Sequence, residues 1–295
     1  MEHSERYLSL DIKELTRTTF IIVYEMGVLF MSNGNGKATC FAIITDIHGN
    51  IHALNEALRL IEDRSDVDKI ICLGDNFSLG ASPAEVLQKL KALPDPIFIR
   101  GNHDRYLTER IWEYDRPTIE GMDPDDPVCI DIVANEKWTA EQIGEEGIDF
   151  IRKMKLSYFV NANEVYAEFT HAWFGRDDLP PSLDEAKKWR DHEQLKHAEA
   201  KTFVFTHGHT HIPRHEHFGN LRVFCQGSTG LPFDEDRRGV LAFLKLENGQ
   251  AQWEIQRFDY DYDAALEQMN KVQPPFFRNL LSTLKYASIR NDLVE

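Results

Sequence analysis

The sequence predicts an α/β fold in which helices cover a parallel sheet. Residues 40–100 alternate apolar, strand-like segments with amphipathic, helix-like segments, the order expected when helices join parallel strands. From residue 221 onward the chain becomes rich in strand-like segments. Five short polar motifs each follow an apolar run. In open α/β sheets, functional sites gather beyond the carboxyl ends of strands, so we expect these motifs to converge.

The composition is that of a globular protein. The chain has 295 residues, of which 42% are hydrophobic, enough for one large domain or two small ones. Its net charge of −16 argues against a dedicated nucleic-acid-binding protein, which needs clustered Lys and Arg. No apolar run is long enough to span a membrane. The four cysteines are scattered without a CxxC, which indicates reduced thiols in a cytoplasmic protein.

The main domain is expected to span residues 39–295, because the first strand-like run begins at about Thr39. Residues 1–38 are therefore predicted to be an N-terminal extension. Two origins stay open for this extension: a start assigned too far upstream, or an appended segment.

The first elements follow in order. A strand over residues 41–44 leads to a helix over residues 51–64, whose apolar side chains share one face and whose N-cap is Asn50. After a second strand, Ser82 is expected to cap another helix, with Pro83 at its first position and Glu85 completing a capping box.

The rest of the chain is predicted to add a helical insert and further strands. Residues 105–162 form a small helical insert beside the site, with an acidic, Pro-rich loop at 117–127. A helix is expected over residues 182–200. Strands and a helical tail broken at Pro274 and Pro275 are expected after that, the strands at 221–225, 240–246 and 252–258.

The polar motifs carry hard ligands for metal ions. They contain carboxylate or amide oxygens and imidazole nitrogens but no thiolate, and their residues are Asp46 and His48, Asp75, Asn102 to Asp104, His171, and His209 with His211. One Asp-x-His alone arises often by chance. All five motifs in order at the ends of predicted strands make chance a poor explanation.

This residue set suits a two-metal site that hydrolyses phosphoesters. Two divalent ions about 3.5–4 Å apart can clamp the attacking and leaving oxygens, and they need a shared anionic ligand, for which Asp75 is the candidate. His103 is placed to protonate the departing alkoxide. The ligand types favour manganese first, with iron, zinc or nickel as alternatives, over magnesium or calcium alone.

The five motifs resemble those of the calcineurin-like metallophosphoesterase superfamily, in particular its compact bacterial and archaeal phosphodiesterase-like branch. The resemblance covers about residues 40–230. It implies a four-layer α/β/β/α sandwich. By motif, one metal would be bound by Asp46, His48, Asp75 and His211, and the other by Asp75, Asn102, His171 and His209. The resemblance implies that His103 is the catalytic histidine. We add Asp104 to the catalytic residues as a group that orients its neighbours.

The sequence also departs from its relatives. Protein Ser/Thr phosphatases of this superfamily carry Gly-Asp-x-x-Asp-Arg-Gly, whereas this chain has Leu79 in place of the arginine. The difference counts against a protein phosphatase and weakens the match to symmetrical diadenosine tetraphosphate hydrolases, which keep that arginine. Arg105 and Arg176 are candidate replacements.

We interpret the chain as a dinuclear metal-dependent phosphoesterase that hydrolyses phosphodiesters or phosphomonoesters with metal-activated hydroxide. Its expected partner is a small phosphorylated substrate, with a nucleotide as one option. Two alternatives stay open: a dinucleoside polyphosphate hydrolase with a different phosphate grip, and a non-catalytic protein-binding scaffold on the same fold. A scaffold has no need of His103 or of a full ligand set.

Overall fold

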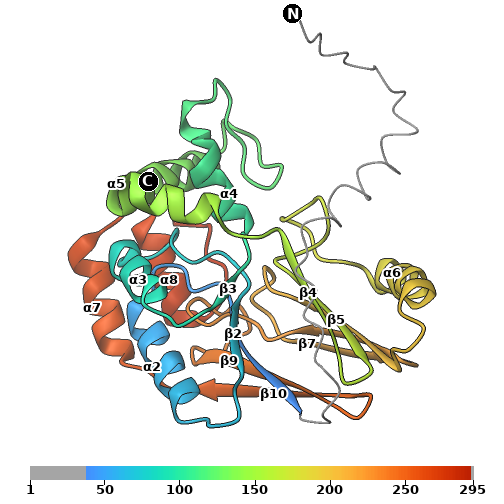
Figure 1. Cartoon of the computed structure of the whole chain (residues 1–295). Coiled ribbons are helices and arrows are strands. Elements are labelled where there is room, and N and C mark those ends of the chain that lie inside the picture. Colours follow the sequence, from blue (N-terminus) through green and yellow to red (C-terminus); the bar gives the residue numbers. More distant parts are fainter. Residues whose placement is uncertain (1–37, 294–295) are drawn as a thin grey trace, which may run out of the picture.

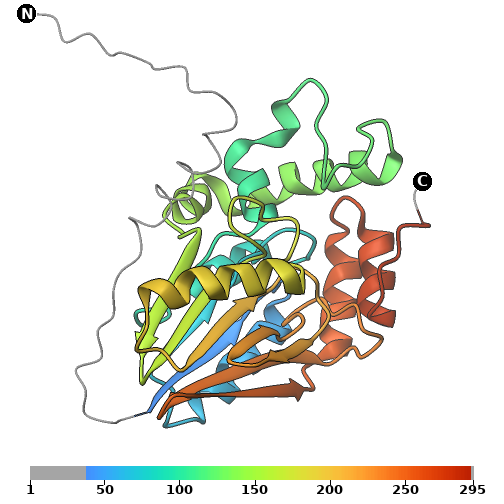
Figure 2. The same cartoon turned by 90° about the vertical axis from the view of Figure 1, so that its right-hand side faces the viewer.

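Two five-stranded sheets lie against each other and carry helices on their outer faces (Figure 1). The computed structural model describes residues 38–293. The strand orders are β10-β9-β1-β2-β3 in the first sheet and β4-β5-β6-β8-β7 in the second. Figure 2 looks onto the face of the sandwich that helix α6 (Leu183–Lys196, yellow) crosses. The predicted four-layer α/β/β/α sandwich is confirmed.

The first sheet joins three parallel strands to an antiparallel pair. Strand β1 lies at its centre, parallel to β2 and antiparallel to β9. The strands are β1 (Thr39–Ile44), β2 (Lys69–Cys72), β3 (Ile97–Phe98), β9 (Gly239–Glu247) and β10 (Gln250–Phe258). Because β1, β2 and β3 run in the same direction, the loops that follow them meet at one edge of the sheet.

The second sheet brings two further loops to the site. Strand β6 is central and runs parallel to both β5 and β8. The strands are β4 (Ser157–Ala162), β5 (Val165–Thr170), β6 (Thr202–His207), β7 (Arg214–Phe218) and β8 (Leu221–Cys225). Strands β4 and β7 were not predicted, and both pair antiparallel with a neighbour at an edge of the sheet.

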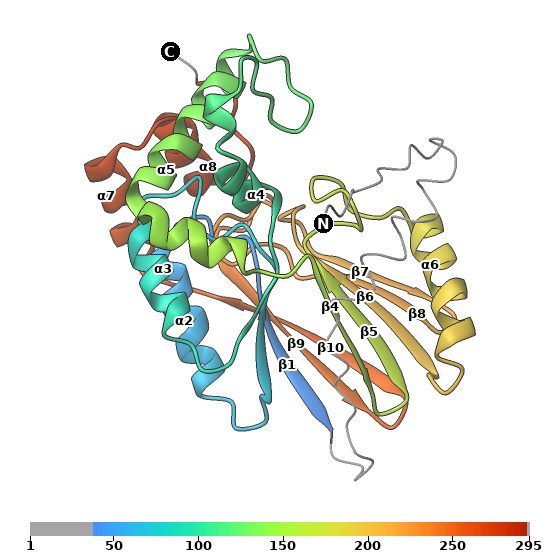
Figure 3. The ribbon, with the colours of Figure 1, turned by 45° about the horizontal axis from the view of Figure 1, so that its top comes forward.

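Helices cover both outer faces. In Figure 3, α6 lies on one side of the sheets and the other helices gather on the opposite side. The helices are α2 (Ile51–Glu62), α3 (Pro83–Lys91), α4 (Asn102–Glu109), α5 (Pro127–Arg152), α6 (Leu183–Lys196), α7 (Tyr262–Val272) and α8 (Phe277–Tyr286), with a 3-10 turn at Ile111–Glu113. None of the helices in the described range is both long and apolar enough to cross a membrane.

Strand β1 connects the two main cores because its side chains alternate between faces. Ala42 and Ile44 pack with α2 and α3 in the outer core. Phe41 and Ile43 point the other way and pack against side chains of the second sheet. Burying one such large side chain contributes about 1.5–3 kcal/mol. The strand that carries the first polar motif is thus held from both sides.

The predicted starts of α2 and α3 are confirmed, but one of the two predicted capping interactions is absent. Asn50 caps α2, its side chain accepting a hydrogen bond from the Ala53 N–H at 3.0 Å. The capping box expected at Ser82 is wrong, since the Ser82 side chain makes no capping hydrogen bond. Its backbone N–H donates instead to the Gly49 carbonyl at 3.0 Å, which ties the start of α3 to the loop after β1.

The predicted insert region contains α4, the 3-10 turn and α5, and residues 114–126 between the turn and α5 are not helical, as expected for most of the predicted loop. Helix α5 is long and has a break at Gly144 (φ 62°). Residues 157–162 at the end of that region form strand β4. The predicted N-terminal extension lies, through residue 37, outside the described residues. The division of the chain into these parts stays a prediction.

Candidate metal centre

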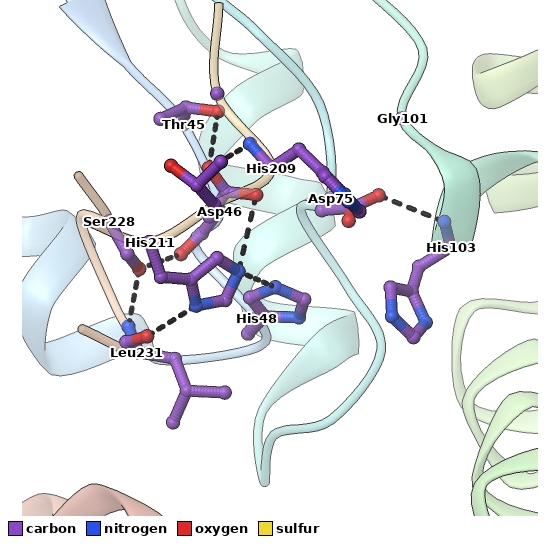
Figure 4. Close-up of polar contacts among 12 residues, drawn as sticks. Thr45, Asp46, His48, Asp75, Gly101, His103, His209, His211, Ser228 and Leu231 are labelled. Carbon is purple, nitrogen blue, oxygen red and sulfur yellow. Dashed lines mark hydrogen bonds and ion pairs between the residues drawn. The ribbon is translucent and has the colours of Figure 1, made fainter. Parts of the chain in front are cut away.

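The polar motifs after β1, β2, β3, β5 and β6 meet at one edge of the sandwich. Figure 4 shows residues of the motifs after β1, β2, β3 and β6. The motifs form two adjacent clusters, and within each cluster the potential ligand atoms lie within 4.8 Å of one another. The first cluster contains Asp46, His48 and His211, and the second contains Asp75, His171 and His209. Asn102 joins the second cluster, since its Oδ1 lies 2.9 Å from His171 Nε2 and 3.1 Å from His209 Nδ1. All seven predicted ligands are therefore brought together.

In the first cluster, two imidazoles turn bare nitrogens toward each other. His48 Nδ1 lies 2.9 Å from the Ser78 carbonyl, and His211 Nδ1 lies within hydrogen-bond reach of the Leu231 carbonyl. A carbonyl only accepts, so each Nδ1 carries the proton and each Nε2 offers a lone pair. These two Nε2 atoms are 3.1 Å apart. Burial and the neighbouring His211 lower the pKa of His48 to about 3, so its ring is neutral.

The Asp46 carboxylate completes this cluster and leaves one oxygen unpaired. Oδ2 accepts hydrogen bonds from Thr45 Oγ1 at 2.8 Å and from the His209 N–H at 3.1 Å. Oδ1 is buried, has no hydrogen-bond partner, and lies 3.4 Å from His211 Nε2. A buried bare oxygen beside two imidazole lone pairs is costly unless a cation satisfies them. The first cluster therefore fits a divalent metal.

The second cluster attracts positive charge as well. His171 Nδ1 donates to the Leu73 carbonyl at 2.7 Å, which turns Nε2 toward Asp75 Oδ2 at 3.2 Å. Burial alone would lower the pKa of His171, but Asp75 and Asp46 outweigh it and raise that pKa to about 10. The same carboxylates that favour a proton here would favour a metal cation. Oxygen and nitrogen donors without sulfur suit first-row divalent ions.

Five of the seven predicted ligands have left-handed backbone conformations. The φ angles are 51° at Asp46, 47° at His48, 53° at Asp75, 68° at His209 and 56° at His211. Each such residue costs about 1–2 kcal/mol, so the surrounding structure must hold it in place. Hydrogen bonds from the Asp46 N–H to the Gly74 carbonyl (2.9 Å) and from the His48 N–H to the Asp75 carbonyl (3.0 Å) do so for two of them.

His103 is held at the start of α4 by two carboxylates. Its backbone N–H donates to Asp75 Oδ1 at 2.9 Å, as Figure 4 shows, and its Nδ1 lies 2.5 Å from Glu136 Oε1. Glycine is required just before this helix, because a Cβ at Gly101 would collide with the Asp75 carboxylate. Burial alone would lower the pKa of His103, but Glu136 and Asp75 raise it to about 9.

Glu136 is the residue that sequence reasoning missed. It lies on α5, is fully buried, and accepts a second hydrogen bond from Ser78 Oγ at 2.6 Å. Ser78 stands where Ser/Thr phosphatases of the superfamily have their second aspartate. The carboxylate next to His103 thus comes from a helix that packs against α4, at a position 33 residues further along the sequence. One signal in the sequence could have indicated that Glu136 is buried. Ile132 and Val133 precede it by four and three residues, so a helix places Glu136 on the same face as these apolar side chains.

Asp104 acts on the backbone of the neighbouring loops. Its Oδ2 accepts the N–H groups of Asp75 and Gly101, both at 3.0 Å. Burial and the nearby Asp75 raise the pKa of Asp104 to about 7. Through these two bonds the Asp104 side chain joins the loop after β2 to the start of α4.

The two candidate arginines are engaged by carboxylates. Arg105 makes two hydrogen bonds of 2.8 Å to the carboxylate of Asp177. Arg176 pairs with Glu185 at 2.8 Å. Both guanidinium groups would have to leave these partners in order to bind a phosphate.

Comparisons with known proteins agree with this geometry. Residues 40–249 match the calcineurin-like phosphoesterase superfamily domain. An uncharacterized protein of Methanocaldococcus jannaschii is 25% identical over 254 residues, which cover 79% of this chain and 93% of that protein. A symmetrical bis(5'-nucleosyl)-tetraphosphatase of Coxiella burnetii is 42% identical, but only over 65 residues, 22% of each chain.

Two solved structures share the fold. A metallophosphoesterase from Sphaerobacter thermophilus has a TM-score of 0.60 at 20% identity and covers 85% of this chain and 100% of its own. A hypothetical protein from Pyrococcus horikoshii has a TM-score of 0.65 at 19% identity, with 85% and 99% covered. The family match over most of the chain, with which the shared fold agrees, identifies the chain as a member of the calcineurin-like phosphoesterase superfamily and a hydrolase of phosphoesters.

Proposed function

We propose that the protein is a dinuclear metal-dependent phosphodiesterase. The observation that carries this proposal is the pair of adjacent clusters in which imidazole lone pairs and carboxylate oxygens face one another within 4.8 Å. Such a complete ligand set, together with His103, supports catalysis rather than the alternative of a non-catalytic scaffold.

The seven ligands divide between two metal positions. Asp46, His48 and His211 would hold one ion, and Asn102, His171 and His209 the other, with Asp75 shared between them. Bound divalent ions would supply charge stabilisation at phosphorus and an acidified water. Manganese is the first candidate, because nitrogen and oxygen donors are mixed in both positions.

His103 would serve the leaving group. Its Nδ1 is engaged by Glu136, so the proton that it can give to substrate is on Nε2. Its ring centroid lies 5.5 Å from that of His48, within reach of a phosphate bound at the two clusters. Glu136 would act as a positioning residue that holds the ring and stabilises its charged form. General acid help of this kind is typically worth about 10²–10⁴-fold in rate.

The neighbourhood favours a diester over a monoester. A terminal phosphate carries two charges and gains most from an arginine clamp, but Leu79 stands at the position of that arginine. A singly charged diester loses less from its absence. The match to a symmetrical tetraphosphatase favours a second candidate, hydrolysis of dinucleoside polyphosphates. The missing arginine counts against it.

A substrate comparison tests the proposal. The protein, supplied with manganese, should hydrolyse bis-p-nitrophenyl phosphate faster than p-nitrophenyl phosphate at equal concentration, and chelator should abolish both activities. His103→Ala should keep its metals and lose turnover. Robust monoester cleavage without diester cleavage would contradict the diesterase. Rapid cleavage of diadenosine tetraphosphate with neither nitrophenyl ester cleaved would favour the second candidate.

A further inference from the structure

A cleft of about 320 Å³ opens beside the two clusters, with His48, Asp75 and His103 in its wall. The remainder of its lining is mostly apolar and comes from segments that lie far apart in the sequence. Leu79 follows β2, Ile119 precedes α5, Ile132 lies on α5, Phe233 follows β8, and Leu280 lies on α8. A volume near 300 Å³ is that of a small-molecule site.

The charges that line this cleft are negative apart from the histidines. Within residues 38–293, neither a lysine nor an arginine lines it, whereas Glu120 and Asp178 do. Glu120 Oε1 accepts a hydrogen bond from Asn102 Nδ2 at 3.0 Å, which places this carboxylate next to the second cluster. A polyphosphate chain that extended beyond the metals would therefore meet carboxylates and apolar side chains in place of cations.

The apolar walls are held in position by one buried side chain. Asn135 of α5 accepts a hydrogen bond from the Leu79 N–H at 2.9 Å through its Oδ1. Its Nδ2 donates to the Pro275 carbonyl, also at 2.9 Å, just before α8 begins. Asn135 thus joins the walls that carry Leu79 and Leu280. Two walls of the cleft are therefore tied to each other through α5.

We propose that this cleft binds an apolar substituent, such as an aryl group, of a singly charged phosphodiester. The proposal rests on the proposed function, and it narrows the substrate class. The one negative charge of the diester faces the metals, and the uncharged substituent replaces water on Leu79, Ile132 and Phe233. Dianionic monoesters and polyphosphates are disfavoured, because no lysine or arginine in the described part of the chain lines the cleft to pair with their additional charge.

The first test compares two substrates with the same leaving group and the same charge. Phenyl p-nitrophenyl phosphate and methyl p-nitrophenyl phosphate differ only in the group that stays on phosphorus. The kcat/KM of manganese-loaded protein for each ester is divided by the rate constant for hydrolysis of the same ester by hydroxide, which corrects for intrinsic reactivity. This corrected kcat/KM should be about tenfold higher for the phenyl ester. Burial of roughly 60 Å² of additional apolar surface gives a ratio of this size. Equal values would overturn the cleft proposal while leaving the phosphodiesterase intact.

A charge placed in the cleft provides the second test. Leu79→Arg should raise the ratio of p-nitrophenyl phosphate to phenyl p-nitrophenyl phosphate turnover by about tenfold, because an ionised donor pairs with the second charge of the monoester. Leu79→Met should leave that ratio low. Leu195→Arg makes the same change on α6, where the leucine is 85% exposed and does not line the cleft, and should not alter the ratio. An equal rise in both arginine variants would overturn the proposal.

Binding separates this proposal from the proposed function. Diphenyl phosphate should bind the manganese-loaded protein about tenfold more tightly than dimethyl phosphate in calorimetry. If no ester is hydrolysed but diphenyl phosphate still binds more tightly, the proposed phosphodiesterase activity is refuted and the proposal of an apolar binding cleft is supported. If esters are hydrolysed without any preference in binding or rate, the cleft proposal fails alone.

Discussion

Replacing Glu136 tests whether a buried carboxylate on a distant helix works through His103. The carboxylate lies 2.5 Å from His103 Nδ1 and 2.6 Å from Ser78 Oγ, and both Glu136 and His103 are buried. Glu136→Gln keeps the shape of the side chain but removes its charge, whereas Glu136→Ala removes the contact. Because the ring would lose its orientation and the support for its charged form, we expect kcat to fall about 10–100-fold for Gln. For Ala the fall should approach the 10²–10⁴-fold of His103→Ala.

The assay is a leaving-group series with manganese-loaded protein. Diesters that release p-nitrophenolate need little help from an acid, while those that release phenolate or an alkoxide need more. Glu136→Gln should therefore lower kcat more for the poorer leaving groups and change KM little. In a protein that already carries His103→Ala, Glu136→Gln should lower kcat almost no further, because the effects of residues that act as one unit are not additive. Metal content by elemental analysis should not change.

Two results would refute this reasoning. One is an equal loss of rate from Glu136→Gln in the presence and absence of the His103 side chain. The other is a loss of bound metal that accounts for the lost activity. Glu193→Gln is the matched control, since Glu193 is equally buried but lies on α6, on the outer face of the second sheet. It should lower stability without changing the dependence on the leaving group.

Three further predictions concern the metals and pH. Asp75→Asn should lower metal content and activity together because it weakens the shared ligand, and full metal occupancy by elemental analysis would contradict the bridging role. Adding manganese at about 100 times its Kd to chelator-treated protein should stabilise it by about 2.7 kcal/mol, and an unchanged Tm in calorimetry would count against a metal site. Burial raises the pKa of Glu168 on β5 to about 8 from 4.5. Between these two pKa values the folded state holds a proton that the unfolded state releases. The stability therefore falls as the pH rises from 4.5 to about 8. Above pH 8, Glu168→Gln should therefore raise the free energy of unfolding relative to the wild type by at most about 5 kcal/mol. Denaturation curves with the same pH dependence in the variant and the wild type would refute this.

The sequence located the candidate ligands better than the residues that support them. Each predicted ligand follows an apolar run that forms a strand, so local pattern and residue type were enough to find Asp46 or His171. Glu136 was missed because its partner His103 lies 33 positions away and only tertiary packing joins them. Strand β7 was missed because its sequence from Arg214 to Phe218 is mostly polar, as suits the edge of a sheet. The expected cap at Ser82 failed because a tertiary contact with Gly49 determines the position of that residue.

The left-handed backbone at five predicted ligands has a consequence for engineering and evolution. Glycine, or asparagine in place of aspartate, would relax these positions and would gain about 1 kcal/mol each. A search for thermostable variants that selects on folding alone would therefore favour changes at Asp46, Asp75 and His209, which are proposed ligands of the metals. Stability and activity oppose each other at these positions, so a screen of this protein should keep selection for turnover in every round.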